Sequence, residues 1–175
     1  MNAPVAGDYV IEPLSDEHDR AGFDCGVEAL SRYLREQAGQ DLRRRVASPF
    51  LLVHRDTRVV AGFYTLANTA LAHGSLPPDL AKKLPRYPFV PATLLGRLAV
   101  AANQQAQGLG EWLLMDALRR SFVNSREIAS FAVVVDASNE QAKAFYSRYD
   151  FAALPDAPLR LLLPMKAIAP MIPTS

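Results

Sequence analysis

The sequence contains a single cysteine, Cys25, so no disulfide can form within the chain. Its longest apolar runs, such as Phe131 to Val135, have the length of a strand, far short of the roughly 18 to 20 residues that a membrane-spanning helix needs. Residues Met1 to Asp8 lack the basic start and the apolar block of a signal peptide. We therefore expect a cytoplasmic protein without a membrane span.

A strong charge of either sign is also missing. The chain has 19 Lys and Arg residues and 18 Asp and Glu residues, which gives a formal net charge of +1 at pH 7. The field of the whole chain therefore does not attract a polyanion, and a nucleic-acid partner would need a local basic patch. The three histidines, His18, His54 and His73, are scattered along the sequence, and we expect no metal site.

The apolar content suits one domain. Half of the 175 residues are hydrophobic, which is enough for a single substantial core. We expect one domain over residues 1–175, with a loose tail at 167–175. Residues 73–92 hold five of the 13 prolines, which excludes a long helix there. Their many apolar side chains indicate an ordered excursion rather than a disordered linker.

Hydrophobic periodicity predicts alternating strands and helices. From Val27 to Val46 apolar residues recur at intervals near 3.6, which predicts one amphipathic helix with Asp24 as its cap. Strands are expected at residues 8–14, within 48–71 as a hairpin, and at 93–100, 129–137 and 159–165, with further helices at about 110–122 and 139–149. This order describes an α/β domain with a mixed sheet.

Two glycines, Gly108 and Gly110, stand at the start of the second expected helix. Glycine lets the backbone approach a ligand closely, and the free amides and dipole of a helix N-terminus attract an anion, so a phosphate is the expected ligand. A Walker loop would need Lys and Ser or Thr where Glu111 and Trp112 stand. A dinucleotide fingerprint would need a small residue in place of Leu113. For the loop alone, a tight turn that only starts the helix remains the alternative.

The pattern Gln105-x-x-Gly108-x-Gly110 resembles the pyrophosphate loop of the GCN5-related N-acetyltransferases (GNAT), which has Gln or Arg, two residues, Gly, one residue, then Gly or Ala. A second segment, NEQAKAFYSRYDF at residues 139–151, matches the Asn, Ala, Phe-Tyr, Tyr-Gly-Phe spacing of the same family. Together the two motifs give a strong signal, because they occur in the family's order.

The sequence departs from the family at two positions. Ala101 follows the strand where the family often has an acidic residue, and Asp150 stands in place of a glycine. Asp tolerates the left-handed conformation that ends a helix, so we expect the second change to be compatible with the fold.

The resemblance implies the GNAT fold, a single domain with a central mixed, mostly antiparallel twisted sheet flanked by helices. It also implies acetyl-CoA as the cofactor and Tyr146 as the catalytic proton donor, with packing beside Phe145 as the alternative role of this tyrosine. The residues that it assigns to acetyl-CoA are Leu98, Ala99, Val100, Gln105, Ala106, Gln107, Gly108, Leu109, Gly110, Glu111, Asn139 and Phe145.

Acetyl transfer from a thioester to an amine needs a neutral amine, a stabilised oxyanion and a proton for the departing thiolate. No Glu or His stands out as a base in this sequence. An α-amine, with a pKa of about 7.7 to 8.0, is partly neutral near pH 7, whereas a lysine amine near 10.4 would need a base. An α-amine is therefore the favoured acceptor. Cys25 has no evident partner base, and we expect a buried small residue rather than a nucleophile.

The resemblance extends over residues 23–165 to the acetyltransferase toxins of type II toxin–antitoxin modules. Its segments are FDCGVEALSRYLREQAGQDLRRRVASPFLLV, VVAGFYTLAN, LPRYPFVPATLLGRLAV and FAVVVDASNEQAKAFYSRYDF. It implies acetylation of the α-amine of an aminoacyl-tRNA, a ribbon-helix-helix antitoxin and a homodimer. By this analogy the RNA would be held by two basic clusters, which comprise Arg43, Arg44, Lys82, Lys83 and Arg86.

Two other functions stay open. One is an N-acetyltransferase for a small amine or a protein N-terminus, which acidic residues around the acceptor would favour. The other is a non-catalytic module that binds CoA or a partner. The presence of both the glycine loop and Tyr146 disfavours this module, because a protein without catalysis has no use for a proton donor.

Overall fold

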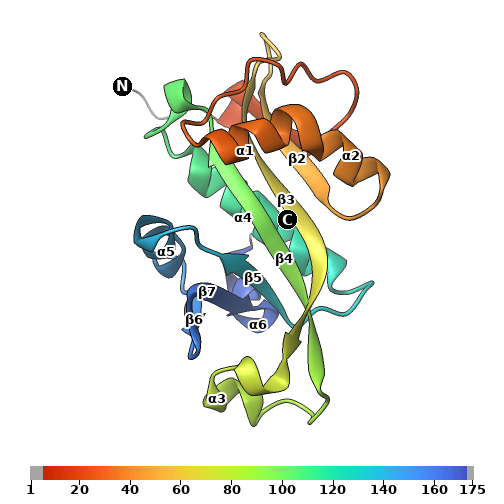
Figure 1. Cartoon of the computed structure of the whole chain (residues 1–175), viewed down its shortest axis with the longest axis vertical. Coiled ribbons are helices and arrows are strands. Elements are labelled where there is room, and N and C mark those ends of the chain that lie inside the picture. Colours follow the sequence, from red (N-terminus) through yellow and green to blue (C-terminus); the bar gives the residue numbers. More distant parts are fainter. Residues whose placement is uncertain (1–5, 173–175) are drawn as a thin grey trace. The chain divides into compact units, whose positions relative to one another are not determined.

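A computed structural model describes residues 6–172 of the chain (Figure 1). The strands form a seven-stranded sheet in the order β1-β2-β3-β4-β5-β7-β6. They are β1 (Tyr9–Pro13), β2 (Ser48–His54), β3 (Val60–Ala72), β4 (Phe89–Val100), β5 (Ala132–Asp136), β6 (Ala152–Leu154) and β7 (Ala157–Pro164). The β4–β5 pair is parallel, and the pairs β1–β2, β2–β3, β5–β7 and β6–β7 are antiparallel. The expected mixed, mostly antiparallel sheet is confirmed.

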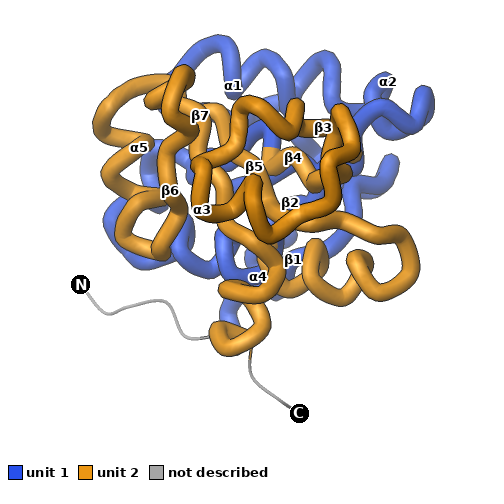
Figure 2. The backbone as a smooth tube through the Cα atoms, turned by 90° about the horizontal axis from the view of Figure 1, so that it is seen from below, with its two compact units in different colours: residues 1–67, 96–117 blue, residues 68–95, 118–175 orange. Residues whose placement is uncertain are grey.

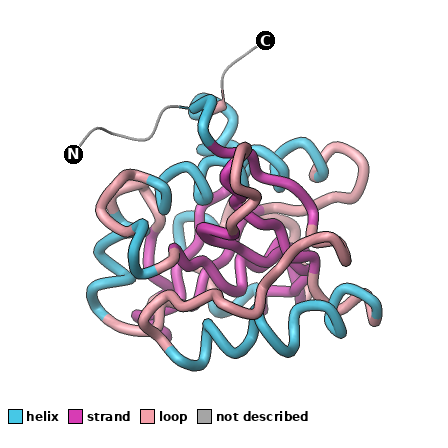
Figure 3. The backbone as a smooth tube through the Cα atoms, turned by 90° about the horizontal axis from the view of Figure 1, so that it is seen from above, coloured by secondary structure: helices cyan, strands magenta, loops and turns pink. Residues whose placement is uncertain are grey.

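Helices flank this sheet, and short helical turns join the elements (Figure 3). The α-helices are α1 (Glu28–Arg32), α2 (Ala38–Arg43), α3 (Pro78–Ala81), α4 (Leu109–Asn124), α5 (Glu140–Ser147) and α6 (Met165–Ile168). The segment Tyr33–Gln37 between α1 and α2 is π-helical. Within residues 6–172, no helix has both the length and the apolar character needed to cross a membrane.

The chain divides into two compact units, each with its own core (Figure 2). Unit 1 contains the described residues up to Ala67 together with Gly96–Ala117, and unit 2 contains Asn68–Leu95 and the described residues from Leu118 onward. The core of unit 1 is built from Leu14, Phe23, Cys25, Tyr33, Leu34, Ala38, Leu51, Val53, Val60, Phe63, Ala99 and Ala101. The core of unit 2 is built from Leu71, Leu76, Val90, Ala92, Ala132, Val134, Leu154 and Leu162.

The helix predicted over residues 27–46 is wrong at its N-terminus. Val27 has extended backbone dihedrals, and the helix begins at Glu28 without a side-chain cap. Asp24, the predicted cap, instead accepts a hydrogen bond from the amide of Gly26 at 2.9 Å. Gly26 has a φ of +87°, and this left-handed residue turns the chain away from the geometry that a cap at position 24 would need.

The register of the same helix also differs from the prediction. The amide of Ala38 bonds to the carbonyl of Tyr33, five residues earlier, so this turn holds one residue more than an α-helical turn. Leu34 and Ala38 are buried as predicted. Leu42, predicted on the same buried face, is 37% exposed, because the extra residue rotates the later helical side chains about the axis. Val46, also predicted on that face, is 60% exposed because it lies beyond the end of α2.

Most other predicted elements are present, with shifted ends. The strand at 8–14, the hairpin within 48–71 and the helices near 110–122 and 139–149 are confirmed. The strand expected from residue 93 begins at Phe89, and β6 was not predicted. Residues 73–81 contain a 3₁₀ turn (His73–Ser75) and α3. Of the expected loose tail, residues 167–171 belong to helical turns and Ile168 is fully buried, whereas residues 173–175 lie outside the described residues.

Candidate active site

The loop between β4 and α4 contains two residues in the left-handed region. Ala106 has a φ of +64° and Gly108 a φ of +80°. A Cβ at Gly108 would meet no atom within 4 Å, so the backbone conformation, rather than space, favours glycine there. The first N–H groups of α4 have no intrahelical acceptor. The loop therefore leads directly into main-chain N–H groups that are available to an anion.

The side chain of Gln105 braces this loop. Its Nε2 donates hydrogen bonds to the carbonyl of Val100 and to the carbonyl of Cys25, both at 3.0 Å. One contact ties the loop to the end of β4, and the other ties it to the segment before α1. Because both donors of the amide are engaged with protein carbonyls, any bond from Gln105 to a phosphate comes from its main-chain N–H.

The position after β4, where the family often has an acidic residue, is held by the main chain. The amide of Ala101 donates to the carbonyl of Ala61, and the amide of Ala102 donates to the carbonyl of Asp24, each at 2.8 Å. Ala101 itself is buried. Two backbone contacts thus fix the entry to the loop without a carboxylate.

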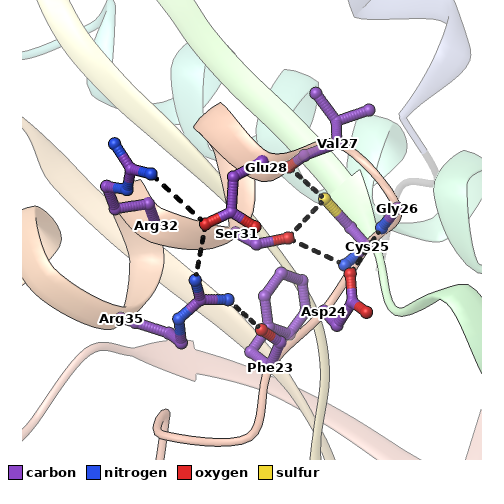
Figure 4. Close-up of polar contacts among 9 residues, drawn as sticks. All are labelled: Phe23, Asp24, Cys25, Gly26, Val27, Glu28, Ser31, Arg32 and Arg35. Carbon is purple, nitrogen blue, oxygen red and sulfur yellow. Dashed lines mark hydrogen bonds and ion pairs between the residues drawn. The ribbon is translucent and has the colours of Figure 1, made fainter.

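Cys25 lies in the polar cluster shown in Figure 4. Its amide donates to Oγ of Ser31 at 3.0 Å, and its Sγ lies 3.3 Å from the same oxygen and 3.5 Å from the carbonyl of Val27. Arg35 donates to the carbonyl of Phe23 and to Glu28, at 2.8 and 3.0 Å. Among the described residues the thiol hydrogen-bonds only with a hydroxyl and a carbonyl, and the expected burial of Cys25 is confirmed.

The strand segment assigned to the pantetheine arm approaches β3 closely. A Cβ on Gly62 would lie 2.8 Å from the carbonyl oxygen of Ala99 and 3.0 Å from Cδ1 of Leu113. Ala99 is buried, whereas Leu98 and Val100 are half-buried. The absence of a side chain at position 62 thus sets the position of the Ala99 carbonyl. The contacts of residues 98–100 with a thioester stay a prediction.

Tyr146 lies on α5 in unit 2. Its ring is 8% exposed and packs edge-on against Phe145 and Phe151, with centroid distances of 5.2 and 5.5 Å. Burial raises the pKa of Tyr146 to about 12. Among the described residues its hydroxyl has no hydrogen-bond partner. The hydroxyl oxygen is not completely enclosed by the protein. The packing alternative thus accounts for the ring and leaves the hydroxyl available.

The ends of α5 are fixed by two residues of the second motif. Oδ1 of Asn139 accepts the amide of Ala142 at 2.9 Å and caps the helix. Asp150, in place of the family's glycine, has a φ of +70°, so the expectation that Asp tolerates this conformation is confirmed. The cap uses only the carbonyl oxygen of the Asn139 side chain.

The predicted RNA-binding residues fall on both units. In unit 1, Arg43 ends α2 and Arg44 is its C-cap, and both are exposed. In unit 2, Lys82, Lys83 and Arg86 follow α3 and are exposed. Lys82 lies 3.5 Å from Asp79, and an ion pair so open to water contributes little.

Three candidate residues were missed in the sequence. Tyr87 and Phe89 are 67% and 62% exposed. Their position among prolines and basic residues was a sequence signal for an exposed aromatic surface. Arg20 lies in the polar stretch before α1, and only the fold brings it against α2. No pattern in the sequence indicated that approach.

Comparison with known proteins identifies the family. Residues 91–160 match the model of the acetyltransferase (GNAT) domain. A tRNA-acetylating toxin of Mycobacterium tuberculosis is 39% identical over 155 residues, which cover 87% of this chain and 90% of that protein. The chain therefore belongs to the GNAT acetyltransferases, in the family of this tRNA-acetylating toxin.

Solved structures agree with this assignment. A crystal structure of KacT, with a tyrosine replaced by phenylalanine, has a TM-score of 0.88 and 34% identity, and covers 94% of this chain and 99% of that chain. AtaT complexed with acetyl-methionyl-tRNAfMet has a TM-score of 0.87 and 31% identity, with the same coverage. A tyrosine-to-phenylalanine mutant of AtaT, bound to the C-terminus of the antitoxin AtaR and acetyl-CoA, has a TM-score of 0.79 and 28% identity over 94% and 98% of the two chains.

Proposed function

We propose that the protein is a toxin that transfers an acetyl group from acetyl-CoA to the α-amine of an aminoacyl-tRNA and thereby blocks translation. The observation that carries this proposal is the 39% identity to a tRNA-acetylating toxin across 87% of the chain. The similarity to AtaT, solved with acetyl-methionyl-tRNAfMet and with an antitoxin, supports both this substrate and silencing by a ribbon-helix-helix antitoxin.

Acetyl-CoA supplies the activated acetyl thioester. We assign its pyrophosphate to the main-chain N–H groups of residues 105–111, because the positive φ at Ala106 and Gly108 and the first turn of α4 present unpaired donors there. Leu98, Ala99 and Val100 are assigned to the pantetheine arm by the resemblance, and Asn139 and Phe145 complete the proposed set.

Tyr146 is the proposed proton donor. A phenol whose pKa is raised to about 12 stays protonated at pH 7. The thiol of the leaving group has a pKa near 8.5, so full proton transfer from this phenol is unfavourable. Tyr146 therefore acts mainly by donating a hydrogen bond to the sulfur as negative charge develops on it. The attacking α-amine needs no strong base, since its pKa is about 7.7 to 8.0.

Radiolabelled acetyl-CoA tests the substrate. The purified protein is incubated with charged or with deacylated total tRNA, and label is counted on the RNA. We expect label on the charged pool only, and a loss of about 100-fold in rate for Tyr146→Phe. Tyr87→Phe, which changes an exposed tyrosine, is the matched control and should keep full activity. Equal labelling of both pools would exclude the aminoacyl amine.

A small cationic amine is the second candidate acceptor, on one observation. Unit 1 contains an open pocket of about 540 Å³ that is lined by three acidic residues, Glu17, Asp19 and Asp24, and by one basic residue, Arg58. Such a lining suits a cation. Acetylation of a diamine in the absence of RNA, at a rate above that on charged tRNA, would favour this function over the first.

We further propose that the protein acts in the cytoplasm, where charged tRNA is available, and as the homodimer that the resemblance implies. The exposed rings of Tyr87 and Phe89 support the dimer, because a second copy would remove them from water. Light scattering on the purified protein should give twice the mass of one 19.2 kDa chain. A single-chain mass at micromolar concentration would contradict it.

A further inference from the structure

Two arginines from different segments of unit 1 converge on the same point of α2. Arg20 precedes α1, and Arg43 is the last residue of α2. A Cβ added to Gly39 would lie 3.3 Å from Nη2 of Arg20 and 3.3 Å from Nη1 of Arg43. Both guanidinium groups therefore pack over Gly39, where a larger residue would carry its side chain.

The π-helical turn is what holds Arg20 in this place. In a regular α-helix the amide of Ala38 would bond to the carbonyl of Leu34. It bonds to Tyr33 instead, and Nη1 of Arg20 donates to the Leu34 carbonyl at 2.7 Å. One nitrogen of Arg20 is thus fixed on the helix backbone, while the other, Nη2, lies over Gly39 beside Arg43.

This pair of cations has no counter-ion within the described chain. Other arginines of the protein have one: Arg35 pairs with Glu28 and Arg160 with Asp136. No ion pair joins Arg20 or Arg43 to a carboxylate of residues 6–172. Like charges held at one point repel, so the arrangement is most favourable when an anion occupies it.

Asp41, on the same helix, does not neutralise the pair. Its Oδ2 accepts the hydroxyl of Tyr33 at 2.8 Å, and its Oδ1 accepts Nε2 of Gln37 at 2.9 Å. Both of its oxygens are therefore engaged with neutral donors. These hydrogen bonds hold the pKa of Asp41 below its usual range, with the bond from Gln37 as the largest cause.

We propose that Arg20 and Arg43, packed together over Gly39, form a binding site for one backbone phosphate of the RNA substrate. Guanidinium groups bind phosphate through paired N–H donors, and the missing side chain of Gly39 lets the two groups lie together against the helix. The inference rests on the proposed function and deepens it, since it assigns to Arg20 and Gly39 a role in holding the tRNA.

The test measures binding of deacylated total tRNA over a range of salt concentrations. Arg20→Gln and Arg43→Gln should each weaken binding about tenfold at low salt and reduce the slope of log Kd against log salt by about one phosphate contact. Arg32→Gln is the matched control, because this exposed arginine already pairs with Glu28 at 3.6 Å. It should leave the slope unchanged.

Gly39→Ala separates binding from folding. Alanine is the better helix former, so the variant should unfold at the same or a higher temperature. Its Cβ would force apart the flexible ends of Arg20 and Arg43, so RNA binding should weaken as in the arginine variants. Unchanged binding and salt slope in all three variants would overturn the site.

Steady-state kinetics distinguish the two sources of phosphate. If the site holds RNA, the variants raise KM for charged tRNA and leave KM for acetyl-CoA unchanged. A rise in KM for acetyl-CoA alone would assign the site to the cofactor and overturn the inference. If wild-type protein acetylates no charged tRNA, the proposed function fails, whereas normal acetylation with unchanged variants removes only this site.

Discussion

The side-chain amide of Gln105 reaches the carbonyl of Cys25 across 80 positions of sequence, at 3.0 Å, and bonds to Val100 at the same distance. These contacts place the loop that we assign to the pyrophosphate relative to the end of β4. We expect Gln105→Glu, which has the same shape but lacks the donors, to raise KM for acetyl-CoA about tenfold because two carbonyls lose their partner. Gln105→Arg keeps N–H donors and should stay near wild type. Steady-state kinetics at varied acetyl-CoA would show the difference, and an unchanged KM in the Glu variant would rule out the brace.

The buried phenol of Tyr146 predicts a loss of stability in alkali. Its pKa is near 10 in the unfolded chain and is raised to about 12 by burial in the folded protein. The protonated phenol therefore makes its full contribution to the free energy of unfolding below pH 10. This contribution is lost as pH rises from about 10 to 12, because the unfolded state releases the proton first. When the pH is raised from 8 to 11, the urea midpoint should fall less for Tyr146→Phe than for wild type. Parallel losses in the two proteins would contradict the raised pKa of this phenol.

Gly62 predicts a substitution that damages stability and activity together. An alanine there would bring its Cβ within 2.8 Å of the Ala99 carbonyl oxygen, so β3 and β4 must separate. We expect Gly62→Ala to lower the free energy of unfolding by about 1 to 3 kcal/mol and to reduce kcat, since residues 98–100 are the proposed thioester strand. Denaturant titration and kinetics measure the two effects. Gly74→Ala, where a Cβ would meet nothing within 4 Å, is the control.

Asn139 allows its structural role to be separated from its proposed role at the cofactor. Asn139→Ala removes the cap of α5 and should cost about 1 kcal/mol of stability. Asn139→Asp keeps a side-chain oxygen for the Ala142 amide and should fold as well as wild type. If the side chain also contacts acetyl-CoA, the Asp variant should still raise KM for the cofactor. A normal KM in that variant would leave Asn139 as a cap only.

The motifs that depend on local backbone rules were predictable from the sequence. Gly108 and Asp150 adopt positive φ at the loop and at the helix end where the patterns required it, because such conformations are decided by a few neighbouring residues. Two apolar runs separated by a polar stretch likewise predicted the β2–β3 hairpin, whose register pairs Leu51 with Phe63. The loop, the final helix and the order of the elements follow from information within short segments.

The features of the fold and of the site that were not predicted depend on contacts between distant segments. No local pattern predicts that the amide of Ala38 bonds to Tyr33 or that α2 ends before Val46, so the burial of Leu42 and Val46 was predicted wrongly. The contact of Gln105 with Cys25 and the approach of Arg20 to Gly39 join residues far apart in the chain. Only the packed unit reveals that the first residue of the pyrophosphate pattern braces the loop with its side chain.

The π turn at Tyr33–Gln37 also decides which way the helix surface after it faces. If the same residues formed a regular α-helix, the helix beyond the turn would swing by about 100° around the axis, because each residue of an α-helix advances by that angle. Arg43 would then leave Arg20 although neither amino acid had changed. Deleting one residue from the turn would instead restore 3.6 residues per turn while the later side chains keep their direction. A single-codon deletion is thus the change that would make this helix regular and leave its basic face in place.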